Sequence, residues 1–174
     1  FSCSKFLADL KAVKIETIKL SEVKCITAKR LRHDLVINRH VKLKDTPAYK
    51  YLQGDEAEFS QYPQFNYHGI NNENRLQGII ESIKTNGYPF EGKYITLFDG
   101  EDIIRDGQHR AAALATVMGL DAEVTVYRFY FRGSKHIVRT KRDNLKRVLI
   151  WSAFKLYKVD MVRKIYRWLK SFIK

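Results

Sequence analysis

The sequence predicts an α/β protein of the α+β kind, with a small mixed β-sheet packed against helices. The clearest strand is the segment 123–131, where Val124 and Val126 alternate with Thr125 and Tyr127. Upstream, apolar residues at intervals of three or four indicate a helix, and a strand, a turn, a strand and a second helix follow it. The predicted order is a helix over 74–86, strands over 94–98 and 103–105, a helix over 110–118 and the strand 123–131.

Residues that suit helix ends and turns mark the boundaries of these elements. Asn74 can cap the first helix, and Asn86-Gly87 followed by Pro89 favours its end. Residues 99–102 predict a hairpin turn between the two short strands, and Gly119 is expected to end the second helix.

The first part of the chain has a less regular pattern. Residues 5–14 are compatible with a short amphipathic helix, residues 15–20 alternate as a strand does, and 21–23 predict a turn. The stretch 24–65 has no clear assignment, and the composition of 63–74 favours a loop. The apolar residues of the unassigned stretch that are spaced for a helix are Leu31, Leu35, Val36 and Val41.

The formal charge of +13 is concentrated at one end of the sequence. Residues 132–174 hold 14 Lys or Arg and two acids, so this tail contributes +12. The remaining 131 residues are nearly neutral, so an argument from basicity to an anionic partner concerns the tail. We therefore expect two parts, a domain over 1–132 and a basic helical extension over 133–174.

The extension is predicted to be helical and amphipathic. Residues 144–174 carry an apolar stripe that includes Ile150, Phe154 and Trp168, with cationic residues on another face. Three interpretations stay open, namely packing on the domain or on a partner helix, contact with an anionic membrane surface, and nonspecific nucleic-acid binding.

Composition places few other limits on function. Cys3 and Cys25 have no spacing suited to a structural zinc site, which favours reduced thiols and a cytoplasmic protein. The sequence has no apolar run of about 18 residues, and its first residues lack a signal-peptide pattern. Cytoplasmic location, with peripheral contact at the inner face of the membrane through the tail, is the expectation.

The segment 106–114 is the strongest functional signal. A glycine between a strand and a helix lets the backbone approach a ligand closely, and the first N–H groups of that helix are unpaired donors. The residues 107–111 are expected to supply these donors. The candidate phosphate-binding residues are Gly107, Gln108, His109, Arg110 and Ala111.

Three side chains of this segment have chemistry of their own. Arg110 offers a fork of donors to phosphate oxygens, and His109 can carry a proton near neutral pH. Asp106 can orient Arg110, cap the helix or hold a metal ion. The opposing interpretation is an ordinary turn between a strand and a helix, with His109 and Arg110 merely exposed at the helix start.

The segment and its surroundings resemble the ParB/sulfiredoxin-like superfamily. Gly107-Gln108-His109-Arg110 stands where that superfamily has a Gly-x-x-Arg phosphate-binding box, and the order of elements over 74–129 is similar. Gln108 replaces the reactive cysteine of sulfiredoxin, so its reductase chemistry is not expected. The chain also leaves no room after residue 131 for the helix-turn-helix of partitioning ParB proteins, which disfavours specific DNA binding.

The resemblance implies a pocket for a nucleoside triphosphate, ATP or CTP, with Mg²⁺. A fainter likeness links Arg32, Asp34 and the aromatic residues that follow them to ParB-like proteins found among bacterial surface-polysaccharide genes. The candidate catalytic residues are then Asp34, Asp106 and His109, with Asp106 also the candidate metal ligand. The candidate substrate-binding residues are Arg32 and His68, although ordinary surface roles for Arg32, Asp34 and His68 stay open.

Two functional hypotheses follow. The first is a nucleotide-dependent phosphotransferase acting on a small hydroxyl-bearing acceptor, for example a sugar in surface-polysaccharide assembly. The alternative is a noncatalytic ParB-like binding module that docks on nucleic acid, a membrane surface or a partner protein through its basic tail.

Overall fold

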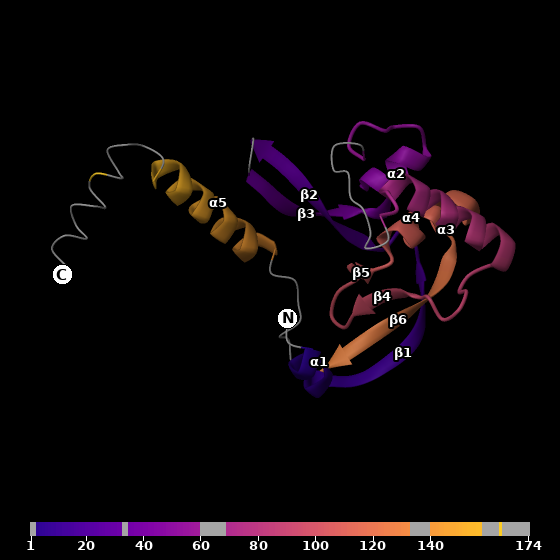
Figure 1. Cartoon of the computed structure of the whole chain (residues 1–174). Coiled ribbons are helices and arrows are strands. Elements are labelled where there is room, and N and C mark those ends of the chain that lie inside the picture. Colours follow the sequence, from indigo (N-terminus) through magenta and orange to yellow (C-terminus); the bar gives the residue numbers. More distant parts are fainter. Residues whose placement is uncertain (1–2, 33–34, 60–68, 133–139, 158–163, 165–174) are drawn as a thin grey trace. The chain divides into compact units, whose positions relative to one another are not determined.

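The computed structural model describes residues 3–32, 35–59, 69–132, 140–157 and 164 (Figure 1). The predicted fold class is confirmed, because a mixed four-stranded sheet and a two-stranded sheet combine with helices. The helices are α1 (Cys3–Asp9), α2 (Pro47–Leu52), α3 (Asn72–Asn86), α4 (Gln108–Met118) and α5 (Thr140–Tyr157), with a short 3-10 helix η1 (Leu43–Asp45) before α2. The strands are β1 (Leu10–Lys19), β2 (Lys24–Arg32), β3 (Leu35–Lys42), β4 (Ile95–Phe98), β5 (Ile104–Asp106) and β6 (Glu123–Phe131).

The chain divides into two compact units. Unit 1 comprises residues 1–27 and 40–138, and unit 2 comprises residues 28–39 and 139–174. The second unit differs from the predicted extension over 133–174 because it also takes in most of the β2–β3 hairpin.

The four-stranded sheet of unit 1 has the order β1-β6-β4-β5. β1 pairs antiparallel with β6 along its length, β6 pairs parallel with β4, and β4 pairs antiparallel with β5 (Figure 1). A parallel pair needs a crossover between its strands, and here β5 and α4 provide it. The helix α4 therefore packs beside the sheet, where it also contacts α2 and α3.

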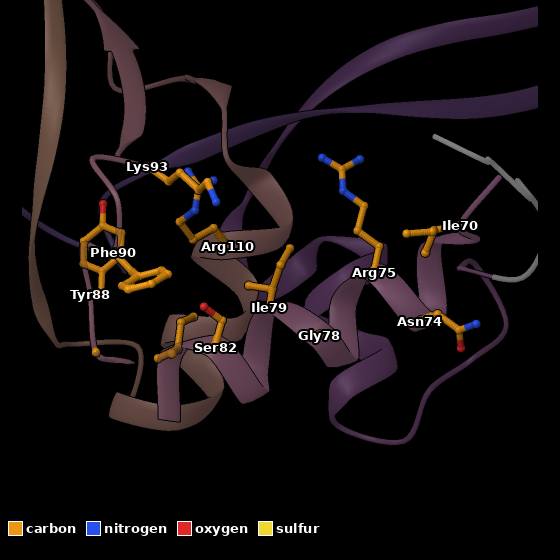
Figure 2. Close-up of a pocket in the computed structure, with 12 residues that line it drawn as sticks. Ile70, Asn74, Arg75, Gly78, Ile79, Ser82, Tyr88, Phe90, Lys93 and Arg110 are labelled. Atoms are coloured by element: carbon orange, nitrogen blue, oxygen red, sulfur yellow. The ribbon is translucent and has the colours of Figure 1, made fainter. Parts of the chain in front are cut away.

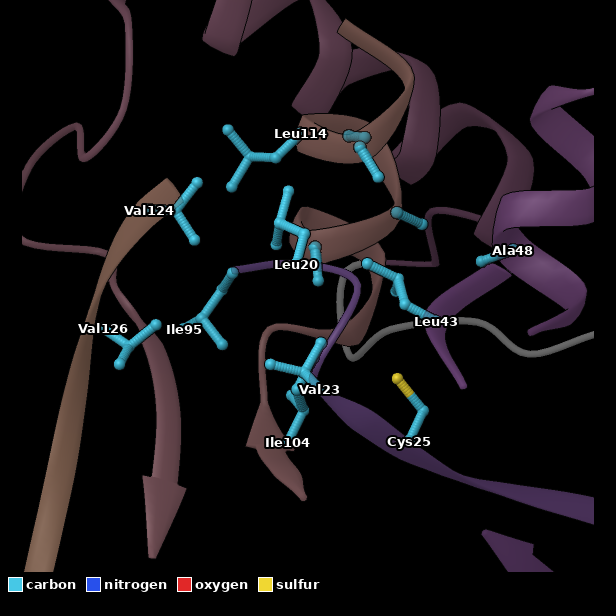
Figure 3. Packing of buried hydrophobic residues seen from close by; sticks show 14 of the residues in the cluster. Leu20, Val23, Cys25, Leu43, Ala48, Ile95, Ile104, Leu114, Val124 and Val126 are labelled. Carbon is cyan, nitrogen blue, oxygen red and sulfur yellow. The ribbon is translucent and has the colours of Figure 1, made fainter. Parts of the chain in front are cut away.

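The core lies between this sheet and the helices (Figure 3). Ile95 and Val126 on the sheet and Leu114 on α4 are fully buried, and the cluster extends to Leu20 and Leu43. The residues 111–113 of α4 are all alanine and have no exposed surface. Their small side chains let the helix axis come close to the strands, which positions the beginning of α4 at the end of β5.

The helix α3 begins earlier than predicted. Its N-cap is Asn71, whose Oδ1 accepts a hydrogen bond of 2.8 Å from the N–H of Asn74. Asn74 thus lies inside the first turn instead of capping it. The predicted end is confirmed, because the N–H of Gly87 donates to the carbonyl of Ile83.

The N-terminal third differs most from the prediction. The helix expected over 5–14 ends at Asp9, and β1 then begins at Leu10. The apolar residues considered for a helix in the unassigned stretch lie on β2 and β3. Buried Cys25 and Thr27 alternate with more exposed neighbours on β2, which is the period of a strand. Burial raises the pKa of the Cys25 thiol to about 12, so this cysteine is protonated and unreactive at neutral pH.

Arg128 ties the 99–102 turn to the sheet. Its Nε donates to Glu16 Oε2 at 2.7 Å and its Nη2 donates to Asp102 Oδ1 at 2.8 Å. Its Nη1 donates to the carbonyls of Phe98 and Glu101, at 3.2 and 3.0 Å. Four acceptors around one guanidinium hold the hairpin that leads into β5 against β6 and β1.

Tyr88 links the start of β4 to β6, and this bridge provides a test of the fold. Its hydroxyl donates to the carbonyl of Thr125 at 2.6 Å and accepts from the N–H of Ile95 at 3.0 Å. Tyr88→Phe leaves both half-buried groups without this partner, so we expect the free energy of unfolding to fall by about 1–3 kcal/mol in urea denaturation.

Tyr127→Phe is the matched control, since its hydroxyl forms no hydrogen bond within the part of the chain that the structure describes. We expect this variant to stay within about 0.5 kcal/mol of the wild type. Equal losses in the two variants would contradict the bridging role of Tyr88.

Candidate anion-binding site

The turn between β5 and α4 requires glycine for two reasons. Gly107 has φ 89° and ψ 23°, a left-handed conformation that costs L-residues energy. A Cβ atom at this position would also lie 3.2 Å from the Cα of Ile95 and 3.2 Å from Nη1 of Arg110. The backbone of the turn therefore passes close to β4, and a side chain at this position would require its neighbours to shift.

The beginning of α4 supplies backbone donors next to this turn. The N–H groups of Gln108, His109 and Arg110 have no acceptor among the residues that the structure describes, as expected for the first turn of a helix. The N–H of Ala111 donates to the carbonyl of Gly107 at 2.8 Å, and its side chain is fully buried. The first hydrogen bond of the helix therefore uses the N–H of Ala111, and the role suggested for Ala111 in phosphate binding stays a prediction.

Arg110 is fixed by the backbone of a neighbouring segment. Its Nη1 donates to the carbonyl of Tyr94 at 2.8 Å, which leaves the other N–H groups of the guanidinium for a ligand. Within the described part of the chain, Asp106 forms no ion pair with Arg110, and α4 has no side-chain cap. Of the three roles considered for Asp106, metal binding is the one that the hydrogen bonds leave open.

Arg110 lines a cavity of about 330 Å³ between α3, α4 and the segment before β4 (Figure 2). Three cations from separate segments lie in its wall, namely Arg75 of α3, Lys93 and Arg110, and none of its lining residues is Asp or Glu. The full lining is Ile70, Asn74, Arg75, Gly78, Ile79, Ser82, Ile83, Gly87, Tyr88, Phe90, Lys93 and Arg110. Positive charge and neutral hydrogen-bonding groups thus face the cavity together, which suits an anionic ligand.

The remaining wall of the cavity is apolar. Ile79 and Ile83 of α3 form one side, and the rings of Tyr88 and Phe90 contribute another. Lys93 has a partner outside the cavity lining, since its Nζ lies 2.5 Å from Glu91 Oε2. Both side chains of this pair are well exposed, so the ion pair is weak and competes little with a bound anion.

His109 packs against aromatic residues and is largely buried. Its ring meets the ring of Phe59 edge to face, with centroids 6.1 Å apart, and Phe59 stacks on Tyr51. Burial, with a smaller contribution from the charge of Arg75, lowers the pKa of His109 to about 4. A pKa this low favours the neutral imidazole at neutral pH and disfavours the predicted proton carrier, which stays a prediction from the sequence.

Asp106 is the carboxylate closest in sequence to the turn. It is the last residue of β5, pairs with Thr96 of β4 and is exposed. Within the described ranges, no three His, Cys, Asp or Glu side chains form a group that could hold a metal ion. The role suggested for Asp106 as a ligand of Mg²⁺ stays a prediction from the sequence.

Of the predicted site residues that the structure describes in unit 1, Arg110 lines the cavity, whereas Asp106, Gly107, Gln108, His109 and Ala111 are not in its lining. Arg32 ends β2 and belongs to unit 2, whereas the cavity lies in unit 1. Asp34 and His68 lie outside the described residues. The roles suggested for these three residues stay predictions from the sequence.

Arg75 and Lys93 are site residues that the sequence analysis missed. A signal for Arg75 was present, since Arg75, Ile79 and Ser82 recur at helical spacing on one face of α3, with the small Gly78 between them. Lys93 had no comparable signal, because a lysine in an irregular segment is ordinarily a surface residue.

No family model, curated protein or solved structure matches the chain.

The close approach at Gly107 can be tested by comparing two glycines. Gly107→Ala introduces both a left-handed alanine and a Cβ 3.2 Å from the Cα of Ile95, so we expect a loss of about 2–4 kcal/mol in the free energy of unfolding. Gly54 has a similar φ of +93°, but no heavy atom lies within 4 Å of the position that a Cβ would take, so Gly54→Ala should lose about 1–2 kcal/mol. Chemical denaturation measures both, and equal losses would show that the contact with β4 is unimportant.

The environment of His109 predicts a pH dependence of stability. Its pKa falls from 6.5 in the unfolded chain to about 4, so the folded state binds fewer protons between these values. The free energy of unfolding therefore decreases as pH falls from 6.5 to 4, by about 3 kcal/mol in total from this group. Denaturation of the wild type and His109→Gln at several pH values measures it. A difference between the two proteins that is the same at about pH 4.5 and pH 7 would contradict the assignment.

Proposed function

We propose that the chain binds a nucleoside triphosphate in this cavity and transfers a phosphoryl group to a small hydroxyl-bearing acceptor. The observation that carries the proposal is the arrangement of Arg75, Lys93 and Arg110 around one cavity that no acid lines. Arg110 belongs to the first turn of α4, which follows the glycine turn directly.

The polyphosphate is the part of the ligand that this site fits best. The N–H groups at residues 108–110 and the positive end of the α4 dipole favour phosphate oxygens. Arg110 is held by Tyr94, so its free N–H groups have a defined direction and little entropy is lost when they bind. Arg75 and Lys93 add charge from two further segments.

The apolar wall supports a nucleotide over a simple phosphate. Ile79 and the rings of Tyr88 and Phe90 offer contacts to a flat base or a sugar, and free phosphate would leave them unused. The cavity volume of about 330 Å³ also lies within the range of small-molecule sites. ATP and CTP are the two nucleotides that the resemblance to the ParB/sulfiredoxin-like superfamily implies.

The remaining components are the metal ion and the acceptor. Mg²⁺ would neutralise developing phosphate charge, and Asp106 would contribute one ligand to it. Neutral His109, next to two free backbone donors, would serve as a hydrogen-bonding residue and not as an acid. The acceptor class, a small alcohol such as a sugar, rests on the fainter likeness to ParB-like proteins of surface-polysaccharide genes.

A noncatalytic nucleotide-binding module is the second candidate. The lining of the cavity includes no carboxylate that could take the proton of an attacking hydroxyl. Such a protein would bind the triphosphate and release it unchanged.

Nucleotide binding can be tested with variants of the cavity cations. We expect wild-type protein to bind ATP or CTP with Mg²⁺ in isothermal titration calorimetry, and Arg110→Ala and Arg75→Gln each to weaken binding by about tenfold or more. Lys84→Gln is the matched control, because Lys84 is an exposed cation on α3 that does not line the cavity. It should bind within about twofold of the wild type.

The results separate the two candidates. Release of nucleoside diphosphate in the presence of a sugar or another alcohol supports phosphoryl transfer, and binding without turnover supports the module. Equal affinity of wild type and Arg110→Ala would contradict the site itself.

A further inference from the structure

The net charge of the protein follows the division into two units. Unit 2, residues 28–39 and 139–174, holds 16 of the 32 Lys and Arg residues and three of the 19 acids. Its formal charge is therefore +13, and the charge of unit 1 is zero. All of the excess charge lies in unit 2, whereas the cavity proposed to bind a nucleotide lies in unit 1. The proposed function therefore does not account for the positive charge of unit 2.

One face of α5 is attached to the edge of β3. The side chain of Asn144 accepts a hydrogen bond of 2.8 Å from the N–H of Asn38 and donates one of 2.5 Å to the carbonyl of the same residue. Arg147 reaches the carbonyl of Val36 at 3.4 Å. Asn144 thus satisfies both backbone groups of an edge-strand residue, and the face of α5 that carries Asn144 and Arg147 is fixed within unit 2.

The other side of α5 exposes apolar residues among cations. Leu145 and Leu149 are four positions apart and therefore share a face, and they are 59% and 60% exposed. Ile150 is 69% exposed. Lys141, Arg142 and Lys146 are exposed on the same helix, and Asp143 is its one acid.

We propose that unit 2 docks on an anionic lipid bilayer through this face of α5. Leu145 and Leu149 would enter the boundary between headgroups and acyl chains, and the neighbouring cations would contact lipid phosphates. In the part of the chain that the structure describes, no helix has the length and apolar character needed to cross a membrane. The proposed association is peripheral, with α5 lying in the plane of the interface.

The exposed leucines favour a lipid surface over nucleic acid. Cations alone would suit phosphates of either kind, but duplex phosphates are contacted by polar and cationic side chains, and exposed leucines there would stay in water. An apolar stripe bordered by Lys and Arg matches both layers of an anionic membrane interface. The exposure of the leucines is thus the feature that distinguishes the two occupants.

Vesicle sedimentation of the full chain tests the proposal. We expect wild-type protein to sediment with phosphatidylcholine vesicles that contain phosphatidylglycerol and to bind vesicles of phosphatidylcholine alone at least about tenfold more weakly. The double variant Leu145→Gln/Leu149→Gln keeps every charge and should lose about tenfold or more in affinity for the anionic vesicles.

The matched control is Val117→Gln/Met118→Gln, which removes two exposed apolar residues, 39% and 54% accessible, from α4 of unit 1. It should bind anionic vesicles within about twofold of the wild type, and circular dichroism checks that both double variants are folded. Binding to anionic vesicles that the Leu145→Gln/Leu149→Gln variant retains would overturn the proposal. So would preferential binding of duplex DNA over the vesicles that does not depend on the leucines.

Discussion

The close approach of the β5–α4 turn to β4 is the constraint on which the rest of unit 1 depends. Gly107 must pass within van der Waals contact of Ile95, so the turn has no side chain and α4 must start directly over the sheet. The buried alanines at 111–113 continue that contact along the helix. Arg110, in the first turn of this helix, donates to the carbonyl of Tyr94 in the segment before β4. Fold and candidate site thus share one packing contact, and a larger residue at 107 would disturb both.

Elements with a regular pattern and a clear end could be predicted from the sequence. The strand 123–131 was placed without error, and the ends of α3 and α4 were fixed by Gly87 and Gly119. The β2–β3 hairpin was missed, since the spacing of Leu31, Leu35 and Val36 also suits a helix, and a local pattern does not record that the two strands pair with each other. The start of α3 was misplaced because Asn71 and Asn74 offer the same capping chemistry, and three-dimensional geometry selects between them.

The sequence analysis singled out one residue of the cavity wall, Arg110, but not the residues around it. Gly107 and Arg110 stood out since a glycine before a helix and an arginine in its first turn have a local physical meaning. Arg75 and Lys93 reach the cavity only through tertiary packing, so their proximity to Arg110 could not be predicted from spacing. The same applies to the pKa of His109, which depends on burial against Phe59 and on the charge of Arg75. From the sequence alone, a histidine is expected to have its ordinary pKa, and only the packing in the folded protein shows that the pKa is lowered.

The two basic features of the protein differ in physical character. Unit 1 is neutral as a whole, yet Arg75, Lys93 and Arg110 line one cavity. Like charges around one cavity oppose folding, and the charge of Arg75 already disfavours the protonated form of His109. An anion bound between the cations removes that repulsion and stabilises the folded state to an extent set by its affinity. The cations of α5 are exposed and salt screens them strongly, so their contribution to docking needs the neighbouring leucines. Three cations around one cavity therefore suit a small polyphosphate, and the dispersed cations and leucines of α5 suit an extended anionic surface such as a lipid bilayer.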